Sequence, residues 1–527
     1  MRLNLELPND TQTIILDPSE VGHKLTAVMR RENLPLNTRC GERLLCRSCT
    51  VDVLRDGEWQ PEPACTLTID RDMTVRVPQH AMLAYNPQIL TDYRINIPYA
   101  YEPLLGAEGL AVAIDIGTTT VALSLVDQTT GAVRTTTTAF NRQMHFGDDV
   151  LTRINLCLTD PNSLSALQEA IVVETILPLL EEALKQTGLT ESDVRGYLIA
   201  GNSTMLHLLA GVDPSPMGYS PFTPRFIEHR EMTSDELGLK PSGVQVHLLP
   251  GVAAYVGADI TGGVLASGLV YDDGPSLLVD VGTNGEIVMK LGDRMVGCAT
   301  AAGPAFEGSG LKCGIRAGDG AISHVSITRD PFTVVNEIIG PPRTKPIGIC
   351  GSAYIDFLAE GSRSGLLNRS GRIQASALPE GDSRVTRGEY GYEFVLGIGQ
   401  GKRKIVVSEP DIARLLQAKA AIAAGIMILL GRLKMKPEDV KTLYLAGGFG
   451  MHLNIENAIH CGLFPGFHPD QVQLVGNTSL AGATLSAIDA SVLGELDRIG
   501  REIDIVELNL DPDFEDTYID QLVLGEA

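Results

Sequence analysis

The stretch Asp115-Ile116-Gly117-Thr118-Thr119-Thr120 lies between two apolar segments, residues 110–114 and 121–126. This pattern predicts a strand, a tight turn and a second strand, with one carboxylate and three hydroxyls at the bend. Gly117 allows the backbone to turn closely, the neighbouring N–H groups can face a phosphate, and Asp115 can hold a hydrated Mg²⁺. Taken alone, the same six residues are equally typical of a polar hairpin turn.

The second half of the chain repeats this pattern. The segment Val279-Asp280-Val281-Gly282-Thr283-Asn284-Gly285 again follows one apolar run and precedes another. Two further pairs of similar segments occur in the same order: residues 198–204 with 443–450, and residues from 249 onward with those from 475 onward. Self-similarity in a fixed order indicates a duplicated fold and not an isolated hairpin turn.

The spacing of the repeats predicts the domain boundaries. We expect a first lobe over residues 110–274 and a second over residues 275–527, with an insertion at about 316–408 in the second lobe. The glycine-rich residues 301–310 are equally compatible with a mobile loop that senses nucleotide and with a simple long connection. Two other nucleotide folds are excluded, because the chain has neither a Walker A sequence nor a G-x-G-x-x-G segment that opens a helix.

Four cysteines near the N-terminus form a separate pattern. Cys40, Cys46 and Cys49 lie close together, and Cys65 follows after a gap of fifteen residues. Three thiolates on one loop and a fourth from elsewhere can hold a [2Fe–2S] cluster, and the spacing is close to the plant-type arrangement, although the last gap is shorter. A structural zinc site is the alternative, but such a site usually has two C-x2-C pairs and only one is present.

The elements expected around these cysteines agree with a cluster domain over residues 1–78. A hairpin turns at residues 8–10, a helix runs to about residue 31, and strands at 50–54 and 74–77 follow the cysteine loop. This order resembles the β-grasp ferredoxins. Residues 79–109 contain prolines and no sustained hydrophobic period, which is typical of a linker.

The order of the repeated segments resembles the acetate kinase, sugar kinase, Hsp70 and actin superfamily, whose two RNase-H-like lobes close on ATP. The resemblance implies that Asp115 and Asp280 orient Mg²⁺. It also places Asp259 where a water-positioning residue is found, although a helix N-cap is an equally compatible role for Asp259. The other nucleotide contacts that it implies are Gly117, Thr118, Thr119 and Thr120 in the first turn, Gly282, Thr283 and Asn284 in the second, and Gly447, Gly448 and Phe449 in the adenosine motif.

The expected fold class is therefore α/β and α+β multidomain: a β-grasp [2Fe–2S] ferredoxin domain followed by duplicated RNase-H-like (actin-like) ATPase lobes. This combination resembles the reductive activators of corrinoid proteins. The resemblance implies an ATP-dependent transfer of one electron from the cluster to cob(II)alamin on a partner corrinoid protein, with an external electron donor protein. A small-molecule kinase with a redox-sensing ferredoxin domain and an ATP-gated corrinoid-protein chaperone remain as alternatives, and a homodimer stays open.

Bulk composition narrows the expected partners and location. A formal net charge of −23 argues against nucleic acid or an anionic membrane as the main partner. The chain does not begin with a basic-then-apolar leader, and charged residues interrupt the apolar stretch 405–433. The five other cysteines have no ligand spacing and are expected as buried thiols. We therefore expect a cytoplasmic protein without membrane insertion and without nucleic acid.

Overall fold

The computed structural model describes residues 1–7, 10–17, 21–32, 34, 36, 49–78, 81, 95–147, 149–308, 310–315, 317–399, 402–448 and 452–525. The chain divides into two compact units. The first contains Met1–Tyr271 and Thr478–Gly500, and the second contains Asp272–Asn477 and Arg501–Ala527. The sequence predicts one contiguous second lobe over residues 275–527, whereas the structure folds residues 478–500 with the first unit.

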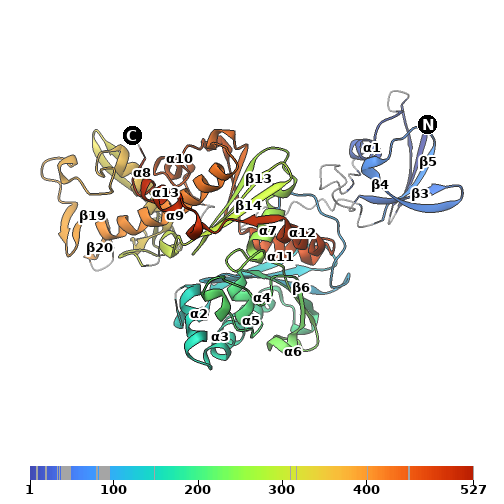
Figure 1. Ribbon diagram of the computed structural model, residues 1–527, viewed down its shortest axis with the longest axis horizontal. Coiled ribbons are helices and arrows are strands. Elements are labelled where there is room, and N and C mark those ends of the chain that lie inside the picture. Colours follow the sequence, from blue (N-terminus) through green and yellow to red (C-terminus); the bar gives the residue numbers. More distant parts are fainter. Residues whose placement is uncertain are drawn as a thin grey trace. The chain divides into compact units, whose positions relative to one another are not determined.

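A small mixed sheet lies at the start of the first unit (Figure 1). Its strand order is β2-β1-β5-β3-β4, in which β1 and β5 are parallel and the other pairs are antiparallel. Alternating residues such as Leu3, Leu5, Val51 and Val53 are buried in its core. The elements are β1 (Arg2–Leu7), β2 (Asp10–Ile15), α1 (Leu25–Arg31), β3 (Thr50–Arg55), β4 (Glu58–Pro63), the 3₁₀ helix η2 (Ala64–Thr66) and β5 (Met73–Arg76).

The second sheet of the first unit contains the stretch 115–120. A meander β6-β7-β8 forms one side of the sheet, and β9 and β11 add to β6 in parallel, with β10 antiparallel at the edge. The strands are β6 (Leu110–Ile116), β7 (Thr120–Asp127), β8 (Val133–Phe140), β9 (Val194–Gly201), β10 (Arg230–Thr233) and β11 (Gln245–Leu248). The helices are α2 (Val150–Thr159), α3 (Ser163–Ile171), α4 (Leu177–Thr187), α5 (Ser203–Leu209), α6 (Ser234–Leu237), α7 (Ala258–Ala266), α11 (Thr478–Ile488) and α12 (Val492–Glu502).

Close packing of two helices explains why residues 478–500 belong to this unit. Helix α11 packs against α7 and contacts β6 and β9. Gly262 of α7 and Gly482 of α11 meet at the crossing, where a Cβ atom on Gly482 would lie 2.5 Å from the Gly262 Cα atom. A side chain at Gly482 would force the helices apart, whereas a Cβ atom on Gly262 would lie 3.3 Å from the Gly482 Cα atom, which is a tight contact.

The main sheet of the second unit repeats the topology of the first. Its order is β22-β21-β12-β13-β14-β23, with a β12-β13-β14 meander and with β21 and β22 added in parallel to β12. The strands are β12 (Ser276–Val281), β13 (Gly285–Leu291), β14 (Arg294–Thr300), β21 (Thr442–Ala446), β22 (Val472–Gly476) and β23 (Ile503–Ile505). Five strands of each sheet therefore share order and direction, and the duplicated fold predicted from the sequence repeats is confirmed.

The sequence predicts an insertion at about 316–408, and this range contains two three-stranded sheets, β16-β15-β17 and β18-β19-β20. One helix of the range, α8, packs against β15. The elements are β15 (Ala321–Arg329), β16 (Phe332–Ile338), β17 (Gly348–Ile349), α8 (Gly351–Arg363), β18 (Val385–Gly388), β19 (Gly391–Ile398) and β20 (Lys404–Ser408). The remaining helices of the unit are α9 (Glu409–Arg432), α10 (Ile455–His460) and α13 (Phe514–Asp520).

Two helical segments are long and apolar enough to cross a membrane by length and composition, residues 163–187 and α9. However, the most apolar part of each segment is at least half inside the protein: 50% of it is buried in residues 163–187, and 78% of it is buried in α9. Burial of this kind is what the core helices of a folded domain show. Among the five cysteines expected as buried thiols, Cys298, Cys313, Cys350 and Cys461 are buried and Cys157 is half-buried.

Candidate functional site

The first turn joins β6 to β7 as the sequence predicts. The Gly117 N–H donates to the Thr120 carbonyl oxygen at 2.9 Å and closes the bend. A Cβ atom at Gly117 would lie 2.7 Å from that oxygen, so only glycine fits. Asp115 lies at the end of β6, half-buried, and accepts a hydrogen bond of 2.7 Å from the hydroxyl of Ser479 on α11. The turn and its carboxylate are thus held together inside the first unit.

A buried arginine supports this turn, and sequence reasoning missed it. Arg153 of α2 is fully buried. Its guanidinium donates to the Thr118 carbonyl oxygen at 2.6 Å, to Gln143 Oε1 at 3.1 Å and to the Gly147 carbonyl oxygen at 3.0 Å. A cation beside a turn also favours the approach of an anion, because little solvent screens it there.

Two asparagines complete the support of the first turn. Asn141 Nδ2 donates to the Gly117 carbonyl oxygen at 3.0 Å, and Asn202 Nδ2 donates to Thr118 Oγ1 at 3.1 Å. Thr118 and Thr119 are both buried, each with 4% of its surface exposed. The shape of this turn is therefore fixed before any ligand binds, which is the arrangement expected of a preorganised site.

Asp259 lies close to the carboxylate of Asp115. Burial and the charge of Asp115 raise the pKa of Asp259 from its usual value to about 7. A carboxylate whose pKa is raised by a neighbouring carboxylate indicates a site where a divalent cation would be stabilised. The alternative role as a helix N-cap is wrong, because Gly257 occupies the cap position of α7 and Asp259 lies within its first turn.

The second turn joins β12 to β13 and has a similar backbone. The Gly282 N–H donates to the Asn284 carbonyl oxygen at 3.0 Å, and the Thr283 hydroxyl donates to Glu307 Oε1 at 3.2 Å. Glu307 belongs to the glycine-rich residues 301–310, so this segment contacts the turn directly.

Gly447, which follows β21, lies against the second turn. Its φ angle is +92°, and a Cβ atom would lie 2.4 Å from the Val281 carbonyl oxygen and 2.9 Å from Asp280 Oδ1. The neighbouring Gly448 has open space where its Cβ would be, since none of the described atoms lies within 4 Å. Glycine at 447 thus lets β21 end beside Asp280, and glycine at 448 leaves room for a ligand. Phe449 lies outside the described residues.

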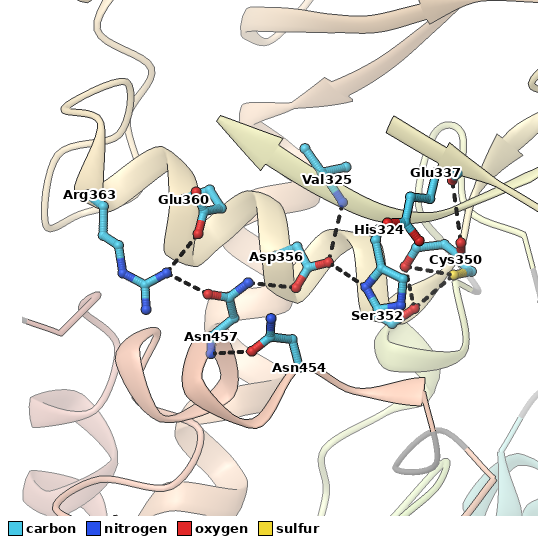
Figure 2. A network of polar contacts seen from close by, with 11 residues as sticks. His324, Val325, Glu337, Cys350, Ser352, Asp356, Glu360, Arg363, Asn454 and Asn457 are labelled. Carbon is cyan, nitrogen blue, oxygen red and sulfur yellow. Dashed lines mark hydrogen bonds and ion pairs between the residues drawn. The ribbon is translucent and has the colours of Figure 1, made fainter. Parts of the chain in front are cut away.

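A buried polar network connects the insertion to the helix that follows the glycine pair (Figure 2). Asp356 of α8 is 2% exposed and accepts from His324 Nδ1 at 2.9 Å, from the Val325 N–H at 3.2 Å and from Asn457 Nδ2 at 2.7 Å. Asn457 lies on α10, and its side-chain oxygen also accepts from Arg363. Strand β15 and helix α8 of the insertion are therefore attached to α10 through one carboxylate.

Two of the four predicted cluster ligands lie within the described residues. Cys49 immediately precedes β3, and Cys65 lies in η2 immediately after β4. The two strands pair antiparallel, and the Ala64 N–H donates to the Cys49 carbonyl oxygen at 3.0 Å, which brings the two cysteines to the same end of the hairpin. Neither forms a disulfide, and both are buried. Cys40 and Cys46 lie outside the described residues.

Two sheets of one topology, each with an aspartate and a glycine turn after its first strand, define the actin-like ATPase class. Comparison with known families agrees with this. The model "RACo middle region" matches residues 110–272, and the model "C-terminal domain of RACo the ASKHA domain" matches residues 274–527.

Individual relatives extend the match over nearly the whole chain. A solved structure of a "Reductive activator for corrinoid,iron-sulfur protein" has a TM-score of 0.76 and 29% identity, and the match covers 99% of this chain and 98% of that one. The corrinoid activation enzyme RamQ of Eubacterium limosum is 28% identical over 94% of this chain and 95% of its own length. A "[Co(II) methylated amine-specific corrinoid protein] reductase" of Methanosarcina barkeri is 25% identical over 74% of this chain and 72% of its own. The chain belongs to the family of reductive activators of corrinoid proteins.

Proposed function

We propose that this chain is an ATP-dependent reductive activator of a corrinoid protein. It transfers one electron to cob(II)alamin on the partner and so regenerates cob(I)alamin, which accepts a methyl group. The observation that carries the proposal is the similarity to a reductive activator over 99% of the chain. The duplicated sheets with their two aspartate turns supply the ATPase part of that activity.

Each of the two turns, considered by itself, offers groups that fit a phosphate and Mg²⁺. The first turn offers a fixed backbone beside a buried guanidinium, and the pair Asp115–Asp259 offers carboxylates that a cation would stabilise. In the second turn, Asp280 lies beside the backbone of Gly447, and Gly448 has open space. Bound Mg²⁺ would neutralise charge on the transferred phosphoryl group, and Asp259 would orient the attacking water.

A [2Fe–2S] cluster fits the N-terminal sheet, which we propose is a β-grasp ferredoxin domain. Cys49 and Cys65 are buried, form no disulfide and lie at one end of a hairpin, as two ligands of one cluster should. With Cys40 and Cys46 they make a four-thiolate set, and an external donor protein would supply electrons. When bound, such a cluster supplies a one-electron centre at about −400 mV if it resembles the plant-type ferredoxins.

Energetics explain why an ATPase and an electron carrier are joined. Moving one electron uphill by 100 mV costs about 2.3 kcal/mol. A Co(II)/Co(I) couple well below the potential of the donor centre therefore needs an input of several kcal/mol. A nucleotide that binds one conformation of the two units more tightly than another can supply this, provided that the conformations also differ in affinity for the corrinoid partner.

Cysteine variants separate this proposal from its alternatives. Cys65→Ser and Cys46→Ser should abolish cob(I)alamin formation and leave ATP hydrolysis unchanged, because the thiols and the turns serve different steps. Cys157→Ser, which changes a half-buried free thiol elsewhere, is the matched control and should retain both activities.

The outcomes that contradict the proposal are distinct. Cob(I)alamin formation that survives in Cys46→Ser and Cys65→Ser would refute the electron route. A phosphorylated small-molecule product would favour the kinase, and a stable complex with the corrinoid protein in which cobalt is never reduced would favour the chaperone.

A further inference from the structure

Three potential metal ligands meet at the edge of the large sheet of the first unit. In the sequence they are distant from the turn at residues 115–120 and from the four N-terminal cysteines. They are His229, Glu231 and His247, and one ligand atom of each lies within 4.8 Å of the others. Glu231 lies on the edge strand β10 and pairs directly with His247 on β11. His229 precedes Glu231 by two residues, so an extended backbone places both side chains on the same face as His247.

The two imidazoles already lie at a separation close to that of metal ligands. His229 Nε2 and His247 Nδ1 are 3.1 Å apart. Two nitrogens bound to one tetrahedral Zn²⁺ at 2.0–2.1 Å would be about 3.3 Å apart. A cation between the two rings would therefore need only small rotations of the side chains, with Glu231 as the third ligand.

Burial holds the ring of His247 with one nitrogen toward the cluster. His247 is 3% exposed, and its Nδ1 atom, not its Nε2 atom, faces His229. One proton bridges the two rings, so the pair shares a single hydrogen bond.

We propose that His229, Glu231 and His247 bind a divalent transition-metal ion of the zinc type. Two imidazole nitrogens and one carboxylate oxygen are ligands that Zn²⁺ prefers, and water can occupy the fourth position on the exposed side. The ion would cross-link the edge strand β10 to β11 through their side chains, in addition to the backbone pairing of the two strands. This site is separate from the nucleotide and cysteine residues, and the proposal does not depend on the proposed function.

The test uses the full-length, cluster-loaded chain without nucleotide, titrated anaerobically with Zn²⁺ in a calorimeter. We expect one Zn²⁺ per chain. Zinc-edge X-ray absorption should show nitrogen and oxygen ligands at about 2.0–2.1 Å and no sulfur near 2.3 Å, which excludes binding by the cysteines. Glu231→Gln and His229→Gln should each weaken binding by at least about tenfold, since even loss of a group that supports a ligand costs 10–100-fold.

Matched controls keep this proposal testable. His468→Gln changes an exposed histidine that lies beside Asp470 and should leave Zn²⁺ affinity unchanged. Glu231 is exposed, so Glu231→Gln should fold, and unchanged ATP hydrolysis would verify this. The proposal is overturned if the chain binds no Zn²⁺, if sulfur ligates the ion, or if Glu231→Gln and His229→Gln bind as tightly as His468→Gln.

Discussion

The two aspartate turns occupy equivalent places in the duplicated sheets, yet the protein supports them differently. The first turn is held by the buried Arg153 and by two asparagines, all of which bond its backbone or its Thr118 hydroxyl. The second is held by the Thr283–Glu307 contact and by the close approach of Gly447. Duplication has therefore kept the strand order and the carboxylate, while the supporting side chains have diverged.

This difference assigns different roles to the two turns. A turn bonded by a buried guanidinium resists change, because each broken bond would leave a buried acceptor unsatisfied. A turn bonded through Glu307, on a glycine-rich segment, changes when that segment moves. We infer that the first turn is a fixed phosphate support and that the second turn reports on the bound nucleotide.

Removal of the arginine should have the largest effect. Arg153→Met removes the guanidinium that bonds two buried oxygen acceptors and the half-buried Gly147 carbonyl oxygen. Since one such acceptor costs about 1–3 kcal/mol, we expect the free energy of unfolding to fall by about 4 kcal/mol. Urea denaturation measures this, and binding of a fluorescent ATP analogue should weaken in parallel. Arg195→Met, at an exposed arginine that donates to the Ser192 carbonyl oxygen, is the control. Equal stability of the two variants would contradict the fixed-support role.

Loss of either aspartate should come next. Asp115→Asn and Asp280→Asn each remove one negative charge that orients the cation, so we expect ATP hydrolysis to fall by about a hundredfold or more in both. Asp293→Asn, in the exposed hairpin turn between β13 and β14, should hydrolyse ATP normally. If Asp115→Asn or Asp280→Asn hydrolyses ATP at the rate of the unchanged chain, the two carboxylates do not have equivalent roles.

The buried lysine of the second unit predicts a dependence on pH. Lys419 donates to the Val523 and Gly462 carbonyl oxygens. Burial lowers its pKa from 10.5 to about 8. The unfolded chain therefore binds more protons than the folded chain between pH 8 and 10.5, and stability should rise with pH there, by at most about 1.4 kcal/mol per pH unit.

Urea unfolding of the chain and of Lys419→Met at pH 8 and pH 9.5 isolates this contribution. Groups that titrate in both proteins cancel in the difference between the two slopes. The unchanged chain should gain more stability over this interval than Lys419→Met does. Identical slopes would show that Lys419 keeps its usual pKa in the folded state.

The smallest expected effect is at the second turn. Thr283→Val removes a single hydrogen bond of 3.2 Å, which is worth about 1 kcal/mol, so ATP affinity should fall by about fivefold. Glu307→Gln keeps an acceptor oxygen for Thr283 and is the matched variant, with nearly normal affinity expected. If Thr283→Val binds ATP as the unchanged chain does, Glu307 does not couple the glycine-rich segment to nucleotide binding.

Local patterns in the sequence predict the two turns well. Each consists of an aspartate and a glycine between alternating apolar runs, and the structure places both at equivalent bends, β6 to β7 and β12 to β13. The repeat of three segments in one order also predicts the shared strand order. Such features depend on residues close together in the chain, so one sequence suffices to recognise them.

Contacts between distant residues were not predictable in this way. Arg153 lies 35 residues from Thr118, and within α2 it has the pattern of an ordinary surface arginine. The contact of Gly262 with Gly482 moves residues 478–500 into the first unit, although small residues in both helices were a visible signal. The pair His229–Glu231 is visible as H-x-E, but only the β10–β11 register brings His247 opposite Glu231.

The most direct test of the central claim is an anaerobic spectrum. The cluster-loaded chain, a reductant and a corrinoid protein in the cob(II)alamin state are mixed with ATP and Mg²⁺, and in parallel without ATP. The absorption band of cob(I)alamin should appear only with ATP and should be absent with Asp115→Asn. Cob(I)alamin formed at the same rate without ATP would contradict the claim that the duplicated ATPase drives the electron transfer.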